Sequence, residues 1–81
     1  MSVTYYVALP FIRTEEGIMA GQPQEMPNES AAIRRAEGMA RDAANAGALA
    51  FKRSGDPSVG SFSDAVILKT FGDVPENLDE L

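Results

Sequence analysis

The chain opens with a stretch in which apolar side chains alternate with polar or smaller ones. Alternation with a period of two is typical of a half-buried β-strand, so we predict a strand over residues 3–12. Pro10 has no amide hydrogen and should mark a bulge or the end of that strand. A turn over 13–17 and a weaker edge strand over 18–22 complete a predicted hairpin. We expect the core to lie against the face formed by Val3, Tyr5, Val7, Leu9 and Phe11.

Apolar residues next recur at intervals of three and four, which predicts one amphipathic helix. Asn28 or Ser30 can cap its start, and Gly47 is expected just past its end. Gly38 falls off the apolar side, so we expect it to face solvent. A stripe of small side chains lets a helix backbone approach a sheet closely. This stripe is mostly alanine, with Ala32, Ile33, Ala36, Met39, Ala40, Ala43 and Ala44.

Two further β-type runs follow the helix, over residues 48–53 and 62–71, with a loop at 54–61 between them. The pattern predicts an α+β fold of the order ββαββ, a four-stranded, mainly antiparallel sheet with one helix packed on one face. The simplest wiring has the spatial order 2-1-3-4, and a parallel pairing of the second and third strands is the alternative. We assign residues 1–72 to a single α+β domain and residues 73–81 to an acidic C-terminal tail.

The chain's 81 residues leave room for one domain with one small core. Its net charge of −5 comes entirely from residues 54–81, where Lys69 stands against six acidic residues. An acidic total disfavours non-specific binding to nucleic acid. The first residues lack the basic start of a signal peptide, and no apolar run approaches the roughly 18 residues of a membrane span. We therefore expect a cytoplasmic protein that does not contact membranes.

Histidine and cysteine are both absent. The chain therefore has no disulfide, no thiolate nucleophile, and neither the usual general base near neutral pH nor the commonest transition-metal ligand. Catalysis would have to rest on a carboxylate, lysine or tyrosine tuned by burial. Most carboxylates fall in turns, on the polar side of the helix or in the tail. We expect no catalytic residue, no metal site and no cofactor.

One cluster of polar and charged residues lies at the mouth of the last predicted loop: Lys52, Arg53, Ser54, Gly55 and Asp56. A guanidinium, a hydroxyl and free backbone amides could cradle a phosphate or another small anion. The favoured alternative is a solvated hairpin in which Asp56 and Pro57 start a type I turn that Gly60 closes. Asp56 and Asp64 as cation ligands form a weaker hypothesis, because two carboxylates without an oxygen-rich loop bind cations poorly.

The predicted helix carries three arginines that could align with Lys52 or Arg53 against a nucleic acid: Arg34, Arg35 and Arg41. Sheet-type RNA readers also need a platform of exposed aromatic rings, and Tyr6 alone is not one. Glu37 lies three or four residues from two of these arginines, a spacing typical of ion pairs on a solvated helix face. The pattern therefore disfavours nucleic-acid binding, which is the second alternative.

The fourth predicted strand holds three consecutive apolar residues at 66–68, which cannot all face one helix. A single helix covers one face of a four-stranded sheet, so an apolar patch should remain on the other face. A two-fold homodimer is the closed, self-complementary way to bury that patch. The alternative is that residues 74–81 fold back over it, with Val74, Leu78 and Leu81 in contact. We predict an interface formed by Tyr6, Ile12, Ala65, Ile67 and Phe71.

Six segments are distinctive: Tyr-Tyr-Val-Ala-Leu-Pro-Phe at 5–11, Ala-Ile-Arg-Arg-Ala-Glu at 32–37, Gly-Ala-Leu-Ala-Phe at 47–51, Arg-Ser-Gly-Asp-Pro at 53–57, Asp-Ala-Val-Ile-Leu at 64–68 and Phe-Gly at 71–72. In these segments the chain resembles a family of small bacterial proteins of unknown function, over nearly its whole length. The resemblance implies a free-standing cytoplasmic domain in a bacterium. It implies no activity, ligand or catalytic residue.

These patterns favour a small non-catalytic interaction or regulatory module, which associates with itself through its sheet as a homodimer or binds an unknown protein partner. The first alternative is a binder of small anionic ligands, or a minor enzyme, that uses residues 52–56. A weak nucleic-acid binder that uses the helix arginines is the second. A phosphate compound that raises the melting temperature would favour the ligand binder, whereas a concentration-dependent mass would favour the module.

Overall fold

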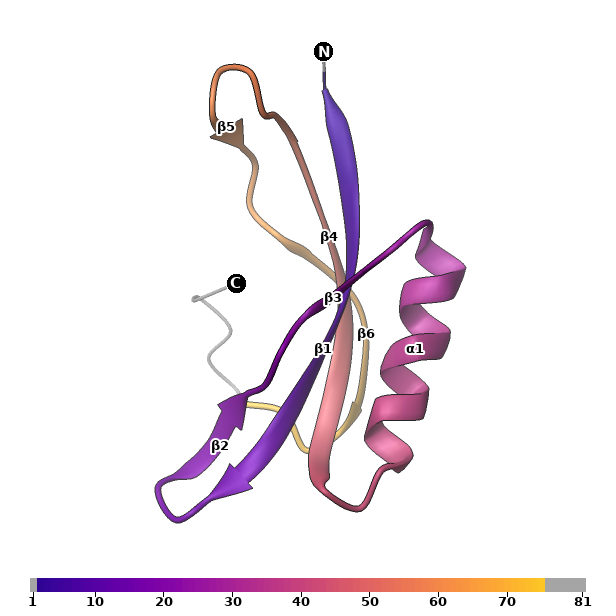
Figure 1. Ribbon diagram of the computed structural model, residues 1–81, viewed down its shortest axis with the longest axis vertical. Helices are drawn as coiled ribbons and strands as arrows, with labels where there is room; N and C mark the ends of the chain where they lie inside the picture. The colour runs from indigo at the N-terminus through magenta and orange to yellow at the C-terminus, as the bar shows by residue number, and fades with distance from the viewer. Residues whose placement is uncertain (1, 76–81) are drawn as a thin grey trace.

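The computed structural model describes residues 2–75, which form one helix and a six-stranded sheet (Figure 1). The helix is α1 (Glu29–Arg41). The strands are β1 (Val3–Thr14), β2 (Gly17–Ala20), β3 (Gln24–Met26), β4 (Asn45–Asp56), β5 (Ser61–Phe62) and β6 (Val66–Gly72). The predicted α+β class, with a helix beside an antiparallel sheet, is confirmed. Within residues 2–75 no helix has both the length and the apolar character needed to cross a membrane.

The sheet is built on β1 and β4, which pair antiparallel from Val3 opposite Gly55 to Phe11 opposite Gly47. β2 and β3 both pair with the other side of β1, and β5 and β6 both pair with the other side of β4. The predicted order, with the first strand beside the strand that follows the helix, is therefore confirmed. All strand pairs among the described residues are antiparallel, so the parallel alternative is wrong.

The prediction of four strands is wrong in one respect, because each outer strand is interrupted and becomes two. Pro10 accounts for the break between β2 and β3. Its carbonyl accepts a hydrogen bond from the Gly21 amide at 2.8 Å, but it has no N–H to donate in return. The break between β5 and β6 follows Ser63, whose amide and hydroxyl both donate to the Ser54 carbonyl, at 2.8 and 2.7 Å.

The start of α1 agrees with the sequence, but its end does not. Asn28 is the N-cap, and its side chain accepts a hydrogen bond from the Ala31 amide at 2.8 Å. The helix ends at Arg41, so the prediction that Gly47 follows its last turn is wrong. Gly47 is buried inside β4, between Phe11 of β1 and Gly72 of β6. Strand β4 therefore begins earlier than predicted and the helix is shorter.

Small side chains fill the space between α1 and the sheet. The cluster at this contact consists of the buried residues Ala8, Ala32, Ala36, Met39, Ala48 and Ala50. Larger side chains pack around its margin, among them Tyr6, Met26, Ile33, Leu68 and Phe71. Because five of these six residues are alanine, the helix can lie close to the strands, with Met39 as the larger side chain of the cluster. Gly38 is exposed to solvent, as predicted.

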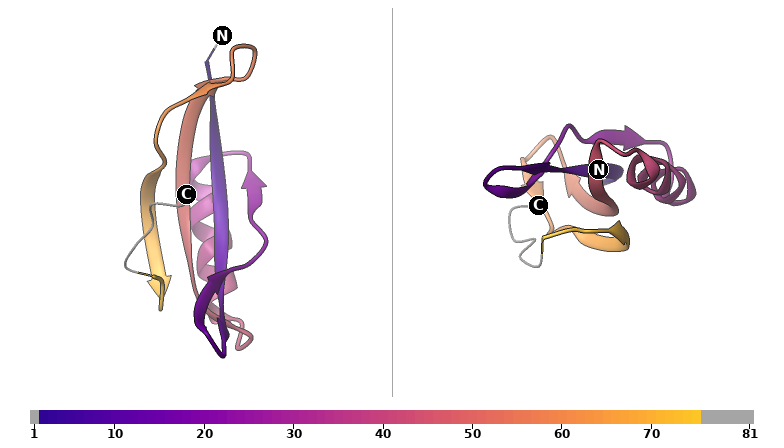
Figure 2. Two further views of the ribbon diagram at one scale, coloured as in Figure 1. Left: turned by 90° about the vertical axis from the view of Figure 1, so that its left-hand side faces the viewer. Right: turned by 90° about the horizontal axis from the view of Figure 1, so that it is seen from below.

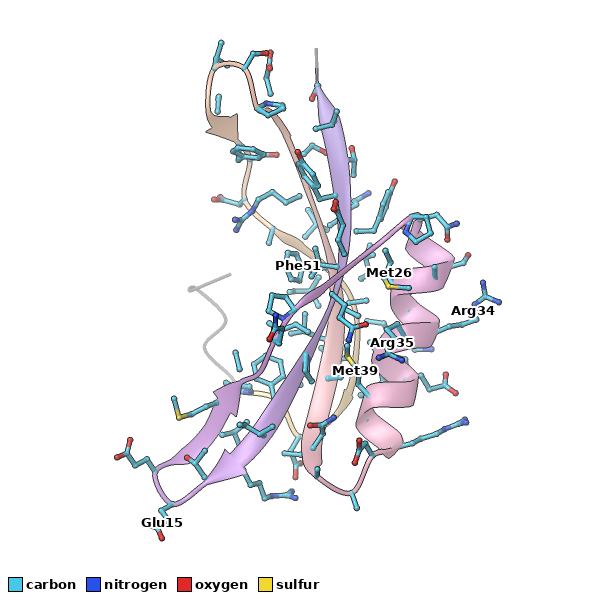
Figure 3. All side chains as sticks on the ribbon, in the orientation of Figure 1. Glu15, Met26, Arg34, Arg35, Met39 and Phe51 are labelled. Atoms are coloured by element: carbon cyan, nitrogen blue, oxygen red, sulfur yellow. The ribbon has the colours of Figure 1, made fainter. Side chains whose placement is uncertain are left out.

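The larger apolar side chains lie on the opposite face of the sheet, so the prediction that they face the helix is wrong. The second buried cluster consists of Leu9, Phe11 and Leu49, with Ile18, Phe51 and Val74 packed against it. The sheet is strongly curled, not flat (Figure 2). In Figure 3, Phe51 of β4 points away from the helix, whereas the side chain of Met39 points from the helix toward the sheet. Alternation identified two faces correctly, but it does not say which face a helix covers.

Helix α1 covers only part of the length of the sheet (Figure 1). The molecule measures 41 Å along its longest axis. A helix of 13 residues spans roughly 20 Å. The end of the sheet that carries β5, the start of β1 and the turn at 57–60 therefore extends beyond the helix.

Two residues of the predicted acidic tail pack against the domain. The side-chain carboxylate of Asp73 forms an ion pair with Arg13. The backbone amide of Asp73 donates a hydrogen bond to the Ala46 carbonyl at 3.0 Å. Val74 folds back onto the sheet and packs against Leu9, Phe11 and Leu49, which lie outside the predicted patch, so the alternative in which the tail covers that patch stays a prediction. Leu78 and Leu81, the other residues of that alternative, lie outside the described residues.

Candidate functional site

The predicted anion-binding cluster at residues 52–56 lies in strand β4, not in a loop, and only residues 57–60 form the turn. Successive side chains of a strand point to opposite faces. Lys52 lies opposite Tyr6 of β1, and Arg53 lies opposite Tyr5, so the two cations are on different faces. The five residues therefore do not all lie on one face of the sheet, and anion binding by this cluster stays a prediction.

The polar groups at the end of β4 are engaged within the hairpin. The hydroxyls of Ser54 and Thr4 are 2.8 Å apart across the β1–β4 pair. A carboxylate oxygen of Asp56 accepts hydrogen bonds from the Ser58 amide at 2.9 Å and the Ser58 hydroxyl at 2.6 Å. These bonds lower the pKa of Asp56. The arrangement is the turn that the sequence analysis favoured over an anion site.

Arg53 has hydrogen-bonding capacity that is not used up. Its Nε atom is buried, and no hydrogen-bond acceptor reaches it from residues 2–75. On the same face the rings of Tyr5 and Phe62 lie with their centroids 6.1 Å apart. Phe62 lies directly over Gly55, where a side chain would collide with the ring. Arg53 therefore lies on the sheet face opposite α1, near an aromatic pair.

The helix arginines do not form one basic surface. Arg41 pairs with Glu37 at 2.6 Å, as predicted, and the Arg35 Nε donates to the Gln24 side chain at 2.8 Å. Figure 3 shows Arg34 pointing away from the sheet and Arg35 turned toward it. A shallow pocket of about 280 Å³ lies beside Arg35, and the polar side chains of Gln24 and Asn45 that line it are already hydrogen-bonded.

The predicted interface residues do not share one face. Tyr6 and Phe71 pack around the cluster beneath the helix, because α1 covers the face on which they lie. Ala65 precedes β6 and is half-buried. Ile12 and Ile67 are each 37% exposed, but Ile12 lies near the β2 hairpin and Ile67 lies on β6. The set as predicted is therefore divided between two faces of the sheet.

A different apolar surface is exposed on the outer strands β5 and β6. It is formed by Phe62, Val66 and Ile67, which are 46%, 52% and 37% exposed, and we call these three residues the edge patch. Val66 and Ile67 are consecutive in β6, so their side chains point to opposite faces and both faces of this strand present apolar groups. Of these three residues, the predicted interface set contained Ile67 but not Phe62 or Val66.

The two edges of the sheet differ. One edge is formed by β2 and β3, which are four and three residues long and separated by the break near Pro10. The other edge is β6, a strand of seven residues that pairs with β4 on one side and with no strand of the described chain on the other. A long edge strand with exposed apolar side chains is a template for pairing with another strand.

No protein-family model, curated protein or solved structure matches this chain. The resemblance to a family of small bacterial proteins therefore stays a prediction. Among residues 2–75, no group of three or more acidic side chains lies close enough together to hold a metal ion.

Proposed function

We propose that this chain is a small non-catalytic interaction module that associates with a second copy of itself through the outer strands of its sheet. The observation that carries the proposal is the edge patch, which places three large apolar side chains on an unpaired sheet edge. Exposed apolar groups in one place are typical of protein contact surfaces. Single apolar residues scattered over a surface are ordinary, but here they adjoin free backbone donors and acceptors.

The chemistry of the described side chains supports a role without catalysis. A general acid that works near neutral pH needs a raised pKa, which requires burial or a neighbouring negative charge. The pKa of Asp56 is shifted in the opposite direction, by the hydrogen bonds from Ser58. The hollow beside Asp56, of about 360 Å³, is shallow and lined mainly by serines. No histidine or cysteine exists to activate any of these hydroxyls.

A second copy is the partner that the edge fits best, because β6 of each copy then provides hydrogen-bond partners for the free backbone groups of β6 in the other. Two identical strands can pair antiparallel about a two-fold axis, and the contact closes after two subunits. Such pairing joins two sheets into one and covers the apolar groups on both faces of β6. The helices stay on the outside of the pair and need not move.

The proposal is tested by sedimentation equilibrium from micromolar to millimolar protein. The wild-type chain should pass from 8.7 kDa to twice that mass as its concentration rises. Ile67→Asp places a charge in the edge patch and should leave only monomer. Met19→Asp is the matched control, because Met19 is also exposed, at 52%, but lies on β2 at the other edge. A wild-type mass of 8.7 kDa at every concentration would contradict the proposal.

One observation favours a second candidate, recognition of an anionic group by Arg53. A buried guanidinium nitrogen without an acceptor is unfavourable, and a carboxylate or phosphate oxygen would satisfy it. Titration with inorganic phosphate should then shift the Arg53 Nε–H resonance, and Arg53→Gln should abolish shifts in the neighbouring amides of Ser54 and Gly55. If millimolar phosphate moves none of these resonances in the wild-type chain, this candidate is wrong.

A further inference from the structure

The hydrogen bonds on β4 reveal which backbone groups of β6 are free. The Ser54 carbonyl accepts from Ser63, and the Ala46 carbonyl accepts from Asp73, so both carbonyls point to the side on which β5 and β6 lie. Backbone groups of a strand point alternately to its two neighbours. The even-numbered residues of β4, from 46 to 54, therefore direct their N–H and C=O groups toward β5 and β6.

The register transfers this pattern onto β6. Val66, Lys69 and Phe71 lie opposite even-numbered residues of β4, so their backbone groups point inward. The register shifts between Ala50 and Phe51 of β4, which leaves Leu68 as the extra residue of a bulge. Three residues of β6 remain whose backbone groups point outward, away from β4: Ile67, Thr70 and Gly72.

We infer that two copies join edge to edge along β6, antiparallel, with Ile67 of one copy opposite Thr70 of the other. This inference rests on the proposed self-association and adds its geometry. In this register Ile67 and Thr70, both outward residues, meet and exchange N–H···O=C bonds at both ends of the contact, and Gly72 lies beyond it. Residues 66–71 of both copies are then paired, which is nearly all of β6.

Side chains agree with the same register. Residues opposite each other in an antiparallel pair have their side chains on one face. Ile67 and Thr70 lie opposite Phe51 and Leu49, and therefore on the face away from α1. On the helix side, Val66 would contact Phe71 of the other copy. A register centred on Lys69 would instead place two ammonium groups together and oppose inward groups to inward groups.

Lysine on an edge strand commonly prevents such pairing. Here the Lys69 Nζ lies 5.3 Å from the centre of the Phe71 ring of its own chain. The side chain is therefore folded along the face of the sheet and is attracted to the ring, so it does not project over the free edge. At the other edge, the short strands β2 and β3 offer a second copy no comparable length to pair with.

Cysteine cross-linking tests the register, because the chain has no cysteine of its own. Opposite residues in a hydrogen-bonded antiparallel pair have Cα atoms about 5.5 Å apart, within the range that a disulfide spans. Ile67→Cys and Thr70→Cys, given different mass labels and mixed under a glutathione redox buffer, should yield mainly the mixed covalent dimer. Each variant alone should yield little. A mixture of Met19→Cys with Thr70→Cys is the matched control and should yield none.

A proline substitution separates this inference from the proposed function. Thr70→Pro removes an outward N–H and leaves the bonds to β4 in place, so it should abolish the dimer while the monomer keeps its fold. Lys69→Pro removes an inward N–H and should lower the melting temperature instead. If the wild-type chain dimerises but Thr70→Pro also dimerises, or the mixed disulfide does not form, the register is wrong and self-association stands. If the wild-type chain is monomeric, both proposals are wrong.

Discussion

Replacing Gly47 by alanine should destabilise the fold strongly, whereas the same change at Gly38 should stabilise it. Gly47 is buried where β4 meets the end of β6. An added Cβ atom would lie 2.5 Å from the Phe71 carbonyl oxygen and 2.6 Å from the Asp73 amide nitrogen, and it would also collide with the Asp73 carbonyl oxygen. All three are backbone atoms, so no side-chain rotation relieves the contact. At Gly38 an added Cβ meets nothing within 4 Å.

The magnitudes follow from these contacts. Overpacking of a core by one methyl group costs about 1–3 kcal/mol, and we take the upper end because only backbone can move. Alanine in place of an exposed helical glycine contributes about 0.5–1 kcal/mol. In a domain of this size 1 kcal/mol corresponds to about 4–8 °C in melting temperature. Circular dichroism should therefore show Gly47→Ala melting at least about 12 °C below wild type, and Gly38→Ala about 2–8 °C above it.

The sequence-based assignment of Gly47 predicts a different outcome. A glycine just past a helix end tolerates alanine at a cost of about 1 kcal/mol, which corresponds to about 4–8 °C and is less than the shift expected here. A melting temperature of Gly47→Ala within a few degrees of wild type would therefore refute the packing of β4 against β6 described here. Urea titration of both variants is the control, since an unchanged slope would show that the denatured states are comparable.

Three further changes test other contacts. Asn28→Ala removes the helix cap and should destabilise the fold by about 1 kcal/mol, measured by urea denaturation. Ser30→Ala is the control, because Ser30 is not the N-cap and its replacement leaves the cap in place. Ala36→Leu should destabilise by about 1–3 kcal/mol because the helix touches alanines, and a neutral result in the same assay would argue against so close an approach. The folded-state pKa of Asp56 is lowered, so its stabilising effect is present above its ordinary pKa of 3.8 and is lost as pH falls through the lowered value. The melting temperature of Asp56→Asn should accordingly lie below wild type at neutral pH and converge with it in acid, and a constant difference across that range would contradict the effect of Ser58.

Much of the fold could be predicted because local patterns specify it. Alternation identified β1, the cap at Asn28 identified the start of α1, and short connections made the antiparallel strand order the simplest. The face covered by the helix could not be predicted from alternation alone, which is symmetric between two faces. Size offered a signal that was not used: Ala8, Ala48 and Ala50 share a face, and alanine is also the residue of the helix stripe.

The candidate site was harder to predict because it depends on register. The cluster at 52–56 reads as a loop on account of its glycine and polar residues, yet pairing with β1 holds it in a strand. The free edge of β6 depends on a bulge at Leu68, and a one-residue shift reverses which backbone groups point outward. No local pattern in the sequence specifies that shift. The apolar run at 66–68 nevertheless pointed to the strand that carries two residues of the edge patch.

Amide hydrogen exchange of Thr70 tests the central claim most directly. In the dimer its outward N–H is hydrogen-bonded to the second copy, and in the monomer it is exposed to water. Its exchange should therefore slow as the protein concentration rises, whereas the inward amide of Phe71 should be protected at every concentration. If Thr70 exchanges at one unprotected rate from micromolar to millimolar protein, while Phe71 remains protected, the β6 edge is not the contact between copies.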